Sequence, residues 1–162
     1  MLRISKLTDY GIVLLVRLAQ EAPGTTHNAR EMAEATELPL PAVSKMLKTL
    51  AAAELLESLR GARGGYRLAR DPSKLSVAEI LEALEGPIAL MDCVVGPGHC
   101  EVESSCGVRE PWQRINRAIH ETLGRVTLDE LARPGPAALL HIEQAPLSEP
   151  VPSSQLPRST EH

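Results

Sequence analysis

Aromatic side chains are scarce in this chain of 162 residues, which has no Phe, one Trp and two Tyr. Proteins that bind single-stranded nucleic acid by stacking need several exposed aromatic side chains, so the composition disfavours RNA-recognition sheets and single-strand-binding barrels. An excess of positive charge is absent as well, because 17 Lys and Arg stand against 21 Asp and Glu. That balance excludes a histone-like protein that is basic over its whole surface.

Long apolar runs are also missing from the sequence. The longest strongly apolar run covers residues 12–16 and is followed by Arg17, whereas a membrane-spanning helix needs about 20 apolar residues. Too few positive charges precede this run for a signal peptide. We therefore expect a cytoplasmic protein with no membrane partner. Thiols stay reduced in that compartment, so three Cys residues predict metal binding or thiol chemistry and not a disulfide framework.

Charge is distributed unevenly along the chain. Residues 39–70 contain six Lys and Arg but only two Glu, whereas residues 71–133 contain six Lys and Arg against eleven Asp and Glu. A basic block in an acidic protein is typical of a compact element that contacts DNA. Taken alone, the same block would also fit a solvated surface stripe.

Apolar spacing and capping residues predict five helices. Thr8 is suited to cap the first helix and Asp9 to its first turn. Asn28 and Ser76 are each followed three residues later by Glu, which indicates capping boxes. Pro41 fits the first position of a helix. The predicted helices cover residues 8–20, 28–36, 41–53, 76–85 and 109–125.

The predicted helix at 41–53 has two contrasting faces. Its apolar stripe at i, i+3, i+4 and i+7 consists of Val43, Met46, Leu47 and Leu50. At about 100° per residue, the opposite face carries Ser44, Lys45, Lys48 and Thr49. A short helix, a turn and a second helix with a polar, basic outer face form a helix-turn-helix. Such side chains can reach phosphates and base edges in DNA.

A β-hairpin is predicted directly after this helix. Apolar residues alternate over 55–60 and 66–68, and the glycine-rich tip between them carries basic side chains. This order indicates a mainly α fold, a winged helix-turn-helix with a small β-hairpin wing. A nucleotide-binding phosphate loop is the rival interpretation, but the GxxxxGK(S/T) pattern is absent. In the hairpin, the DNA-contacting residues are predicted to be Arg60, Arg63, Gly64, Gly65 and Tyr66.

The predicted helix at 109–125 is the longest amphipathic segment after the wing. Its apolar side includes Trp112, Ile115, Ile119 and Leu123. Such a stripe can pair with a second copy of itself in a two-fold dimer, which DNA half-sites also require. Alternatively, it folds back on its own domain. We favour the homodimer.

All three cysteines fall in one Gly- and Pro-containing stretch, as Cys93, Cys100 and Cys106. A zinc knuckle would need a C-x2–4-C spacing, which is absent. Thiolates are soft ligands that suit iron–sulfur clusters. A cysteine enzyme would need a placed histidine and an oxyanion site, and no catalytic pattern is found. The stretch therefore predicts a metal site, and the protein is not expected to be an enzyme.

The chain divides into three predicted regions. Residues 1–75 form the winged helix-turn-helix, and residues 76–133 hold the cysteine loop and the dimerisation helix. Residues 134–162 include six Pro and are expected to be a disordered tail.

These segments resemble the Rrf2 family of winged-helix transcription regulators, which includes the IscR and NsrR types. The resemblance covers about residues 1–133, and it is closest to the regulators of the SUF system of iron–sulfur assembly. It implies a homodimer whose iron–sulfur cluster tunes binding to double-stranded promoter DNA. The matching motifs are LTDYG at 7–11, LPLPAVSKMLKTL at 38–50, RGARGGYRLA at 60–69, EALEGPIALMDC at 82–93 and ESSCGVREPWQRINRAI at 103–119.

The resemblance implies three cysteine ligands but leaves the fourth open. The IscR type has a histidine three residues after the last cysteine, where this chain has Arg109. The NsrR type uses an aspartate from the partner subunit, which corresponds to Asp9 here. Asp9 could equally be only a helix N-terminal charge, and His99 is a third candidate. Whether the cluster is 2Fe–2S or 4Fe–4S stays open for the same reason.

Two further hypotheses remain at this point. The cysteines could form a metal-free thiol, redox or nitric-oxide sensor on a DNA-binding repressor. The basic hairpin could instead bind an acidic protein partner, in which case no specific DNA target would exist.

Overall fold

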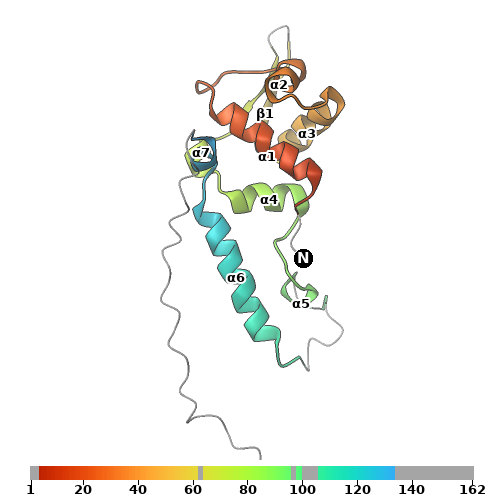
Figure 1. Ribbon diagram of the computed structural model, residues 1–162, viewed down its shortest axis with the longest axis vertical. Coiled ribbons are helices and arrows are strands. Elements are labelled where there is room, and N and C mark those ends of the chain that lie inside the picture. The colour runs from red at the N-terminus through yellow and green to blue at the C-terminus, as the bar shows by residue number, and fades with distance from the viewer. Residues whose placement is uncertain (1–3, 62–63, 96–97, 100–105, 134–162) are drawn as a thin grey trace, which may run out of the picture.

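The computed structural model describes residues 4–61, 64–95, 98–99 and 106–133 of the chain. A helical body with a two-stranded antiparallel sheet occupies one end of the molecule, and α6 extends away from it (Figure 1). The expected mainly α fold with a small hairpin is confirmed. In chain order, the elements are α1 (Lys6–Ala19), α2 (Ala29–Thr36), α3 (Leu40–Ala52), β1 (Leu56–Leu59), β2 (Gly65–Leu68), η1 (Pro72–Lys74), α4 (Val77–Glu85), α5 (Asp92–Val95), α6 (Arg109–Arg125) and α7 (Leu128–Ala132).

Helix α1 begins two residues earlier than predicted, and Thr8 is not its cap. Ser5 is the cap, and its hydroxyl accepts a hydrogen bond of 3.2 Å from the Thr8 backbone N–H. The Thr8 side chain is buried and its hydroxyl donates to the Glu85 carboxylate. The Ser5 N–H donates to the same carboxylate at 2.9 Å. These bonds lower the pKa of Glu85 and join the start of α1 to the end of α4.

Helices α2 and α3 form the predicted helix-turn-helix. The capping box of α2 is confirmed, because Asn28 accepts from the Glu31 N–H at 3.0 Å and the Glu31 carboxylate accepts from the Asn28 N–H at 2.9 Å. Glu37 ends α2 in the left-handed region, with φ of 56°, which turns the chain towards α3. Helix α3 starts at Leu40, one residue before the predicted start, and keeps Pro41 in its first turn.

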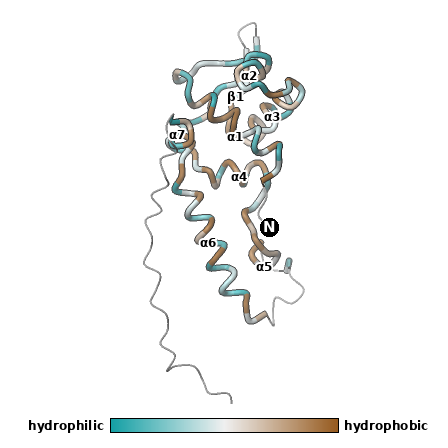
Figure 2. Tube along the Cα trace, in the orientation of Figure 1, coloured by the Kyte–Doolittle hydropathy of each residue, from teal (hydrophilic) through white to brown (hydrophobic). Residues whose placement is uncertain are grey.

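The core lies where α1, α3, the hairpin, α4 and α7 meet. The four residues of the α3 stripe are at most 4% exposed. They pack with Leu14 and Leu15 of α1 and with Ile80 of α4, all three fully buried. Complete burial of one such side chain contributes about 1.5–3 kcal/mol. Figure 2 shows the apolar residues concentrated along α1, whereas they alternate with polar residues along α6.

Helix α7 was not predicted, although its side chains complete the core. Leu128 is fully buried, and its N–H donates to the Leu75 carbonyl at 2.8 Å. The Val77 N–H donates to the Val126 carbonyl at 2.9 Å, so the segments that precede α4 and α7 pair side by side. The Gln20 side chain at the end of α1 donates to the Ala132 carbonyl at 3.0 Å. The chain after α6 therefore returns to the end of α1 and to the segment before α4.

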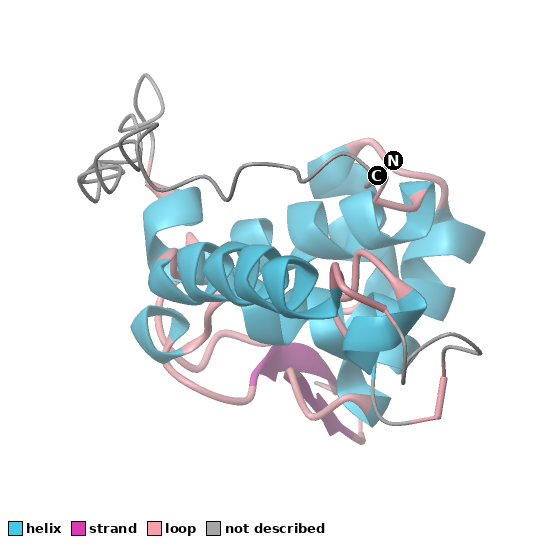
Figure 3. Ribbon diagram, turned by 90° about the horizontal axis from the view of Figure 1, so that it is seen from below, coloured by secondary structure: helices cyan, strands magenta, loops and turns pink. Residues whose placement is uncertain are grey.

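Helix α6 has the bounds that the sequence predicts, and none of its residues is buried. It packs against α4 and α5, and its His120 lies 3.2 Å from the Glu82 carboxylate of α4. Val108 and Ile115 remain 57% and 45% exposed. Viewed from below, the two strands lie at one edge of the helical body (Figure 3). No helix in the part of the chain that the structure describes could cross a membrane. The predicted tail at 134–162 lies outside the described residues.

Candidate DNA interface and cysteine segment

The outward face of α3 carries the side chains predicted to meet DNA. Lys45, Lys48 and Thr49 are exposed, and Ser44 is half-buried. The Thr49 hydroxyl donates to the Lys45 carbonyl at 3.2 Å, which leaves its oxygen free to accept. Neither lysine forms an ion pair with any residue that the structure describes. Two ammonium groups are thus presented to solvent one helical turn apart.

The hairpin divides its arginines between two roles. Strands β1 and β2 pair from Leu56 opposite Leu68 to Leu59 opposite Gly65. Arg67 is held by Glu57, with two guanidinium nitrogens 2.7 and 2.8 Å from one carboxylate oxygen. Arg60 at the tip is exposed and has no ion pair among the described residues. Arg63, the other predicted tip contact, lies outside the described residues.

The two adjacent glycines of the wing are required by contacts within the chain itself. A Cβ on Gly65 would lie 2.5 Å from the His27 carbonyl oxygen, and a Cβ on Gly64 would lie 2.4 Å from the Leu59 carbonyl oxygen. Tyr66 pairs its backbone with His27 through hydrogen bonds of 2.8 and 3.0 Å, and its half-buried ring packs on the core. These residues fix the wing to the chain before α2. Their contact with DNA remains a prediction.

Replacing Gly65 with Ala should lower the free energy of unfolding by about 1–3 kcal/mol, because the methyl group would clash with backbone that cannot move away easily. DNA affinity should fall as well, because the clash separates the wing from the helix-turn-helix. Chemical denaturation measures the first effect and a DNA titration the second.

The matched control is Gly124→Ala in α6, where a Cβ would meet nothing within 4 Å. It should instead stabilise the protein by about 0.5–1 kcal/mol, because alanine favours the helix. Equal unfolding free energies for the wild type and Gly65→Ala would contradict the close contact.

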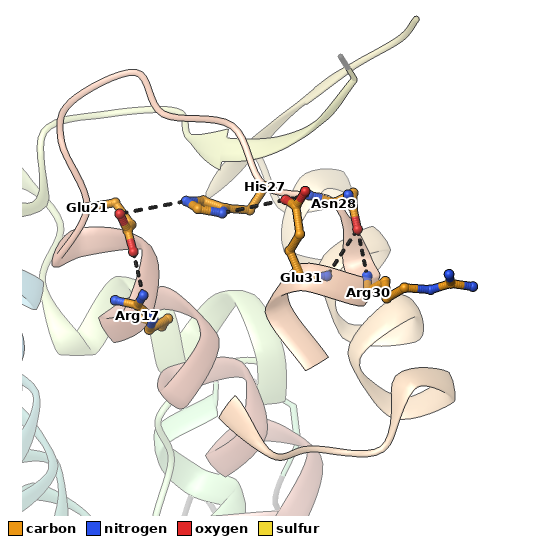
Figure 4. Close-up of polar contacts among 6 residues, drawn as sticks. All are labelled: Arg17, Glu21, His27, Asn28, Arg30 and Glu31. Atoms are coloured by element: carbon orange, nitrogen blue, oxygen red, sulfur yellow. Dashed lines mark hydrogen bonds and ion pairs between the residues drawn. The ribbon is translucent and has the colours of Figure 1, made fainter. Parts of the chain in front are cut away.

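The segment between α1 and α2 is held by a series of contacts between charged and polar side chains (Figure 4). Arg17 lies 2.6 Å from Glu21, and the His27 ring lies between two carboxylates, 3.9 Å from Glu21 and 3.7 Å from Glu31. Arg30 extends away from this group, is exposed, and has no ion pair among the described residues. It adds a cation at the start of α2 that the sequence analysis missed. The sequence feature that could have identified Arg30 is its position as a basic residue in the first turn of the first helix of the helix-turn-helix.

Four exposed cations without an ion pair among the described residues lie at one end of the molecule. Arg30 on α2, Lys45 and Lys48 on α3, and Arg60 on the wing all belong to elements that lie together at the top of Figure 1. Double-stranded DNA presents about one negative charge per 1.7 Å along its axis. A helix and a hairpin with unpaired cations beside one another can therefore bind DNA across a groove and its flanking phosphates.

The cysteine segment lies at the other end of the described chain. Cys93 is in α5, which packs against α6. Cys106 is half-buried, is not part of a disulfide, and lies three residues before the start of α6. Cys100 and the side chain of Cys93 lie outside the described residues. The structure thus places α5, which contains Cys93, against α6, which begins shortly after Cys106.

The candidates for a fourth ligand lie on other elements. Asp9 is exposed in the first turns of α1 and lines a shallow pocket with Ile4 and Ile12. It follows Thr8, which is bonded to Glu85 at the end of α4. His99 is exposed. Among the residues that the structure describes, no three His, Cys, Asp or Glu side chains gather as a metal site.

The donor set present in the chain fits an iron–sulfur cluster. Thiolates are the preferred ligands of iron in such clusters, and carboxylates and imidazoles supplement them. Helix α5, which contains Cys93, packs on α6, which starts three residues after Cys106. Asp9 is exposed, so its carboxylate is accessible from outside this chain.

The arrangement of α1 to α3 and the hairpin defines a winged helix-turn-helix DNA-binding protein. The sequence model of the Rrf2 family, described as an iron-dependent transcriptional regulator, matches residues 4–134. The chain belongs to the Rrf2 family of transcriptional regulators.

Named relatives agree with this assignment. The transcriptional regulator CymR of Bacillus subtilis is 29% identical over 131 residues, which are 81% of this chain and 90% of CymR. The regulator NsrR of the same organism is 26% identical over 133 residues, 82% of this chain and 91% of NsrR. Because these relatives are transcriptional regulators, the prediction that the protein is not an enzyme is confirmed.

Solved structures show the same fold. The structure of CymR, described as the global cysteine regulator of B. subtilis, gives a TM-score of 0.64 at 31% identity and covers 82% of this chain and 97% of CymR. The structure of IscR from T. potens gives a TM-score of 0.60 at 29% identity, with coverage of 80% and 86%. The chain is a DNA-binding transcriptional regulator.

Proposed function

We propose that the protein is a cytoplasmic homodimeric repressor whose binding to promoter DNA is tuned by an iron–sulfur cluster, and that it controls SUF-type genes of cluster assembly. The observation that carries the proposal is the contact between α5 and α6, which holds the helix of Cys93 against the helix that starts three residues after Cys106. The iron-dependent description of the family and the likeness to NsrR and IscR support it.

The DNA face of the proposal consists of α3 and the wing. Lys45 and Lys48 would contact phosphates or guanine edges, and Ser44 and Thr49 would bond to phosphate or base edges. The wing would contact the neighbouring backbone through the residues predicted from the sequence, namely Arg60, Arg63, Gly64, Gly65 and Tyr66.

Dimerisation would use α6. This helix has no buried residue, and Ile115 on it and Val108 just before it expose apolar surface that the described part of the chain does not cover. A second copy of the same helix would cover it symmetrically. Two recognition helices then lie at a fixed separation, as the half-sites of an operator require.

The cluster would be held by Cys93, Cys100 and Cys106, with Asp9 of the partner subunit as the fourth ligand. When bound, a cluster would supply redox-sensitive iron–thiolate bonds to these cysteines. The chain's own residues hold the cysteine segment on α6 and tie the start of α1 to α4. A tenfold change in DNA affinity needs only about 1.4 kcal/mol, so a modest shift of these elements is sufficient.

Anaerobic purification followed by iron and sulfide analysis and an absorption spectrum tests this proposal. The wild-type protein should be coloured with stoichiometric iron and sulfide, and Cys100→Ala should be colourless and bind promoter DNA with altered affinity. Ser104→Ala is the matched control, because it changes the same loop without removing a thiol. Unchanged promoter affinity in Cys100→Ala, relative to the iron-loaded wild type, would refute the sensing role.

A metal-free thiol sensor is the second candidate. The half-buried, unbridged thiol of Cys106 and the likeness to CymR, described as a global cysteine regulator, favour it. A wild-type protein that remains colourless after reconstitution with ferrous iron and sulfide would favour this candidate over the cluster.

A further inference from the structure

Asn116 is a polar residue in an otherwise apolar row of α6. It lies four residues after Trp112 and three before Ile119, and Leu123 continues the row. Residues with this spacing share one face of a helix. All four side chains are half-buried. An amide in such a place costs free energy unless both its oxygen and its nitrogen are hydrogen-bonded.

Both polar atoms of Asn116 bond to the chain that leads from α4 to α5. Its Oδ1 accepts from the Leu90 N–H at 3.1 Å, and its Nδ2 donates to the Ile88 carbonyl at 2.8 Å. Within residues 87–90, which the structure describes in full, no other hydrogen bond reaches a different element. The side-chain amide thus bonds to the N–H of one residue and the carbonyl of the residue two positions earlier, which is the pattern that a neighbouring β-strand would use.

We infer that Asn116 is the positioning residue that fastens the cysteine segment to α6. Cys93 follows Leu90 by three residues, so a displacement of Cys93 is transmitted to α6 at this point. The inference rests on the proposed function for the role of the cysteines, and it applies equally to a cluster and to free thiols. An amide side chain is required, because a carboxylate cannot donate to Ile88 and an aliphatic chain can do neither.

Amide hydrogen exchange on the full, metal-free chain tests the fastening directly. In Asn116→Ala, the Leu90 amide should exchange about tenfold faster, the factor that corresponds to about 1.4 kcal/mol. The Gly86 amide, which donates to the Glu82 carbonyl at 3.0 Å, should be unaffected. Asn116→Asp should restore only part of the protection of Leu90, because its carboxylate still accepts from the Leu90 N–H but cannot donate to the Ile88 carbonyl. Arg117→Ala, an exposed neighbour on the same helix, is the matched control and should equal the wild type.

A second measurement connects the fastening to sensing. The DNA affinities of the protein reconstituted with ferrous iron and sulfide and of the metal-free protein are compared on a duplex selected from random sequences. Their ratio should move towards one in Asn116→Ala, and the visible absorption of the reconstituted variant should decay faster under a chelator. Arg117→Ala should keep the wild-type ratio and decay.

The outcomes separate this inference from the proposed function. A wild-type ratio of one would refute cluster sensing, and the inference would then be decided by the exchange of Leu90 alone. An unchanged Leu90 exchange rate in Asn116→Ala would overturn the inference. So would an unchanged affinity ratio, where the wild type shows a ratio different from one.

Discussion

Replacing Leu128 with Ala is expected to lower the free energy of unfolding by about 2–5 kcal/mol, the usual cost of truncating a fully buried leucine. Leu128 belongs to α7 but is part of the core formed by α1, α3 and α4. The loss should therefore destabilise the DNA-binding region, although its helix α3 lies more than 50 residues before Leu128 in the sequence. Chemical denaturation followed by circular dichroism measures the change.

Leu131→Ala is the control for this prediction. Leu131 lies on the same short helix but is 41% exposed, so its truncation should change stability by less than about 1 kcal/mol. If both variants unfolded at the same denaturant concentration as the wild type, α7 would not be part of the core in solution.

Removing both lysines of α3 should have the largest effect on DNA binding. For Lys45→Ala combined with Lys48→Ala, we expect a loss of about 100-fold in affinity for a selected duplex, since each good contact is worth about 1–3 kcal/mol. If both lysines contact phosphates, the slope of log affinity against log salt should decrease by about two. Fluorescence anisotropy at several salt concentrations gives both quantities.

Lys74→Ala removes one exposed positive charge from η1, which packs against α7. Its affinity and salt slope should stay near those of the wild type. A double variant that binds as tightly as Lys74→Ala would mean that α3 does not face DNA.

Local sequence signals predicted most of the elements. The capping box at Asn28 and the apolar period of residues 109–125 each depend on a few neighbouring residues, and both predictions are confirmed. Thr8 was wrong as a cap because two hydroxyl residues precede the apolar run, and only tertiary contact decides between them. Glu85, 77 residues away, accepts from Thr8 and leaves the cap to Ser5.

Helix α7 was missed for a related reason. Its five residues are too few for a convincing period, although the pair Thr127 and Glu130 forms a capping box. The helix is stabilised mainly by the burial of Leu128 against distant residues, which no local pattern shows.

The candidate site was predictable in composition but not in detail. Sequence reasoning assigned the exposed lysines of α3 from helical spacing alone. It could not show that Glu57 holds Arg67, nor that Gly65 faces the His27 carbonyl, because both depend on pairing between separate segments. Asn116 could have been noticed as a break in an apolar stripe, but its partners at 88 and 90 appear only in three dimensions.

The pairing of the segments before α4 and before α7 has a consequence for how the protein is made. The Leu75 carbonyl and the Val77 N–H bond to Leu128 and Val126, so the last piece of the core follows the cysteine segment in the order of synthesis. The DNA-binding end therefore cannot reach full stability until the ribosome has translated both the cysteine segment and α7. A premature stop codon after the wing would thus yield a fragment prone to degradation, and a DNA-binding region without the cysteine segment would not accumulate.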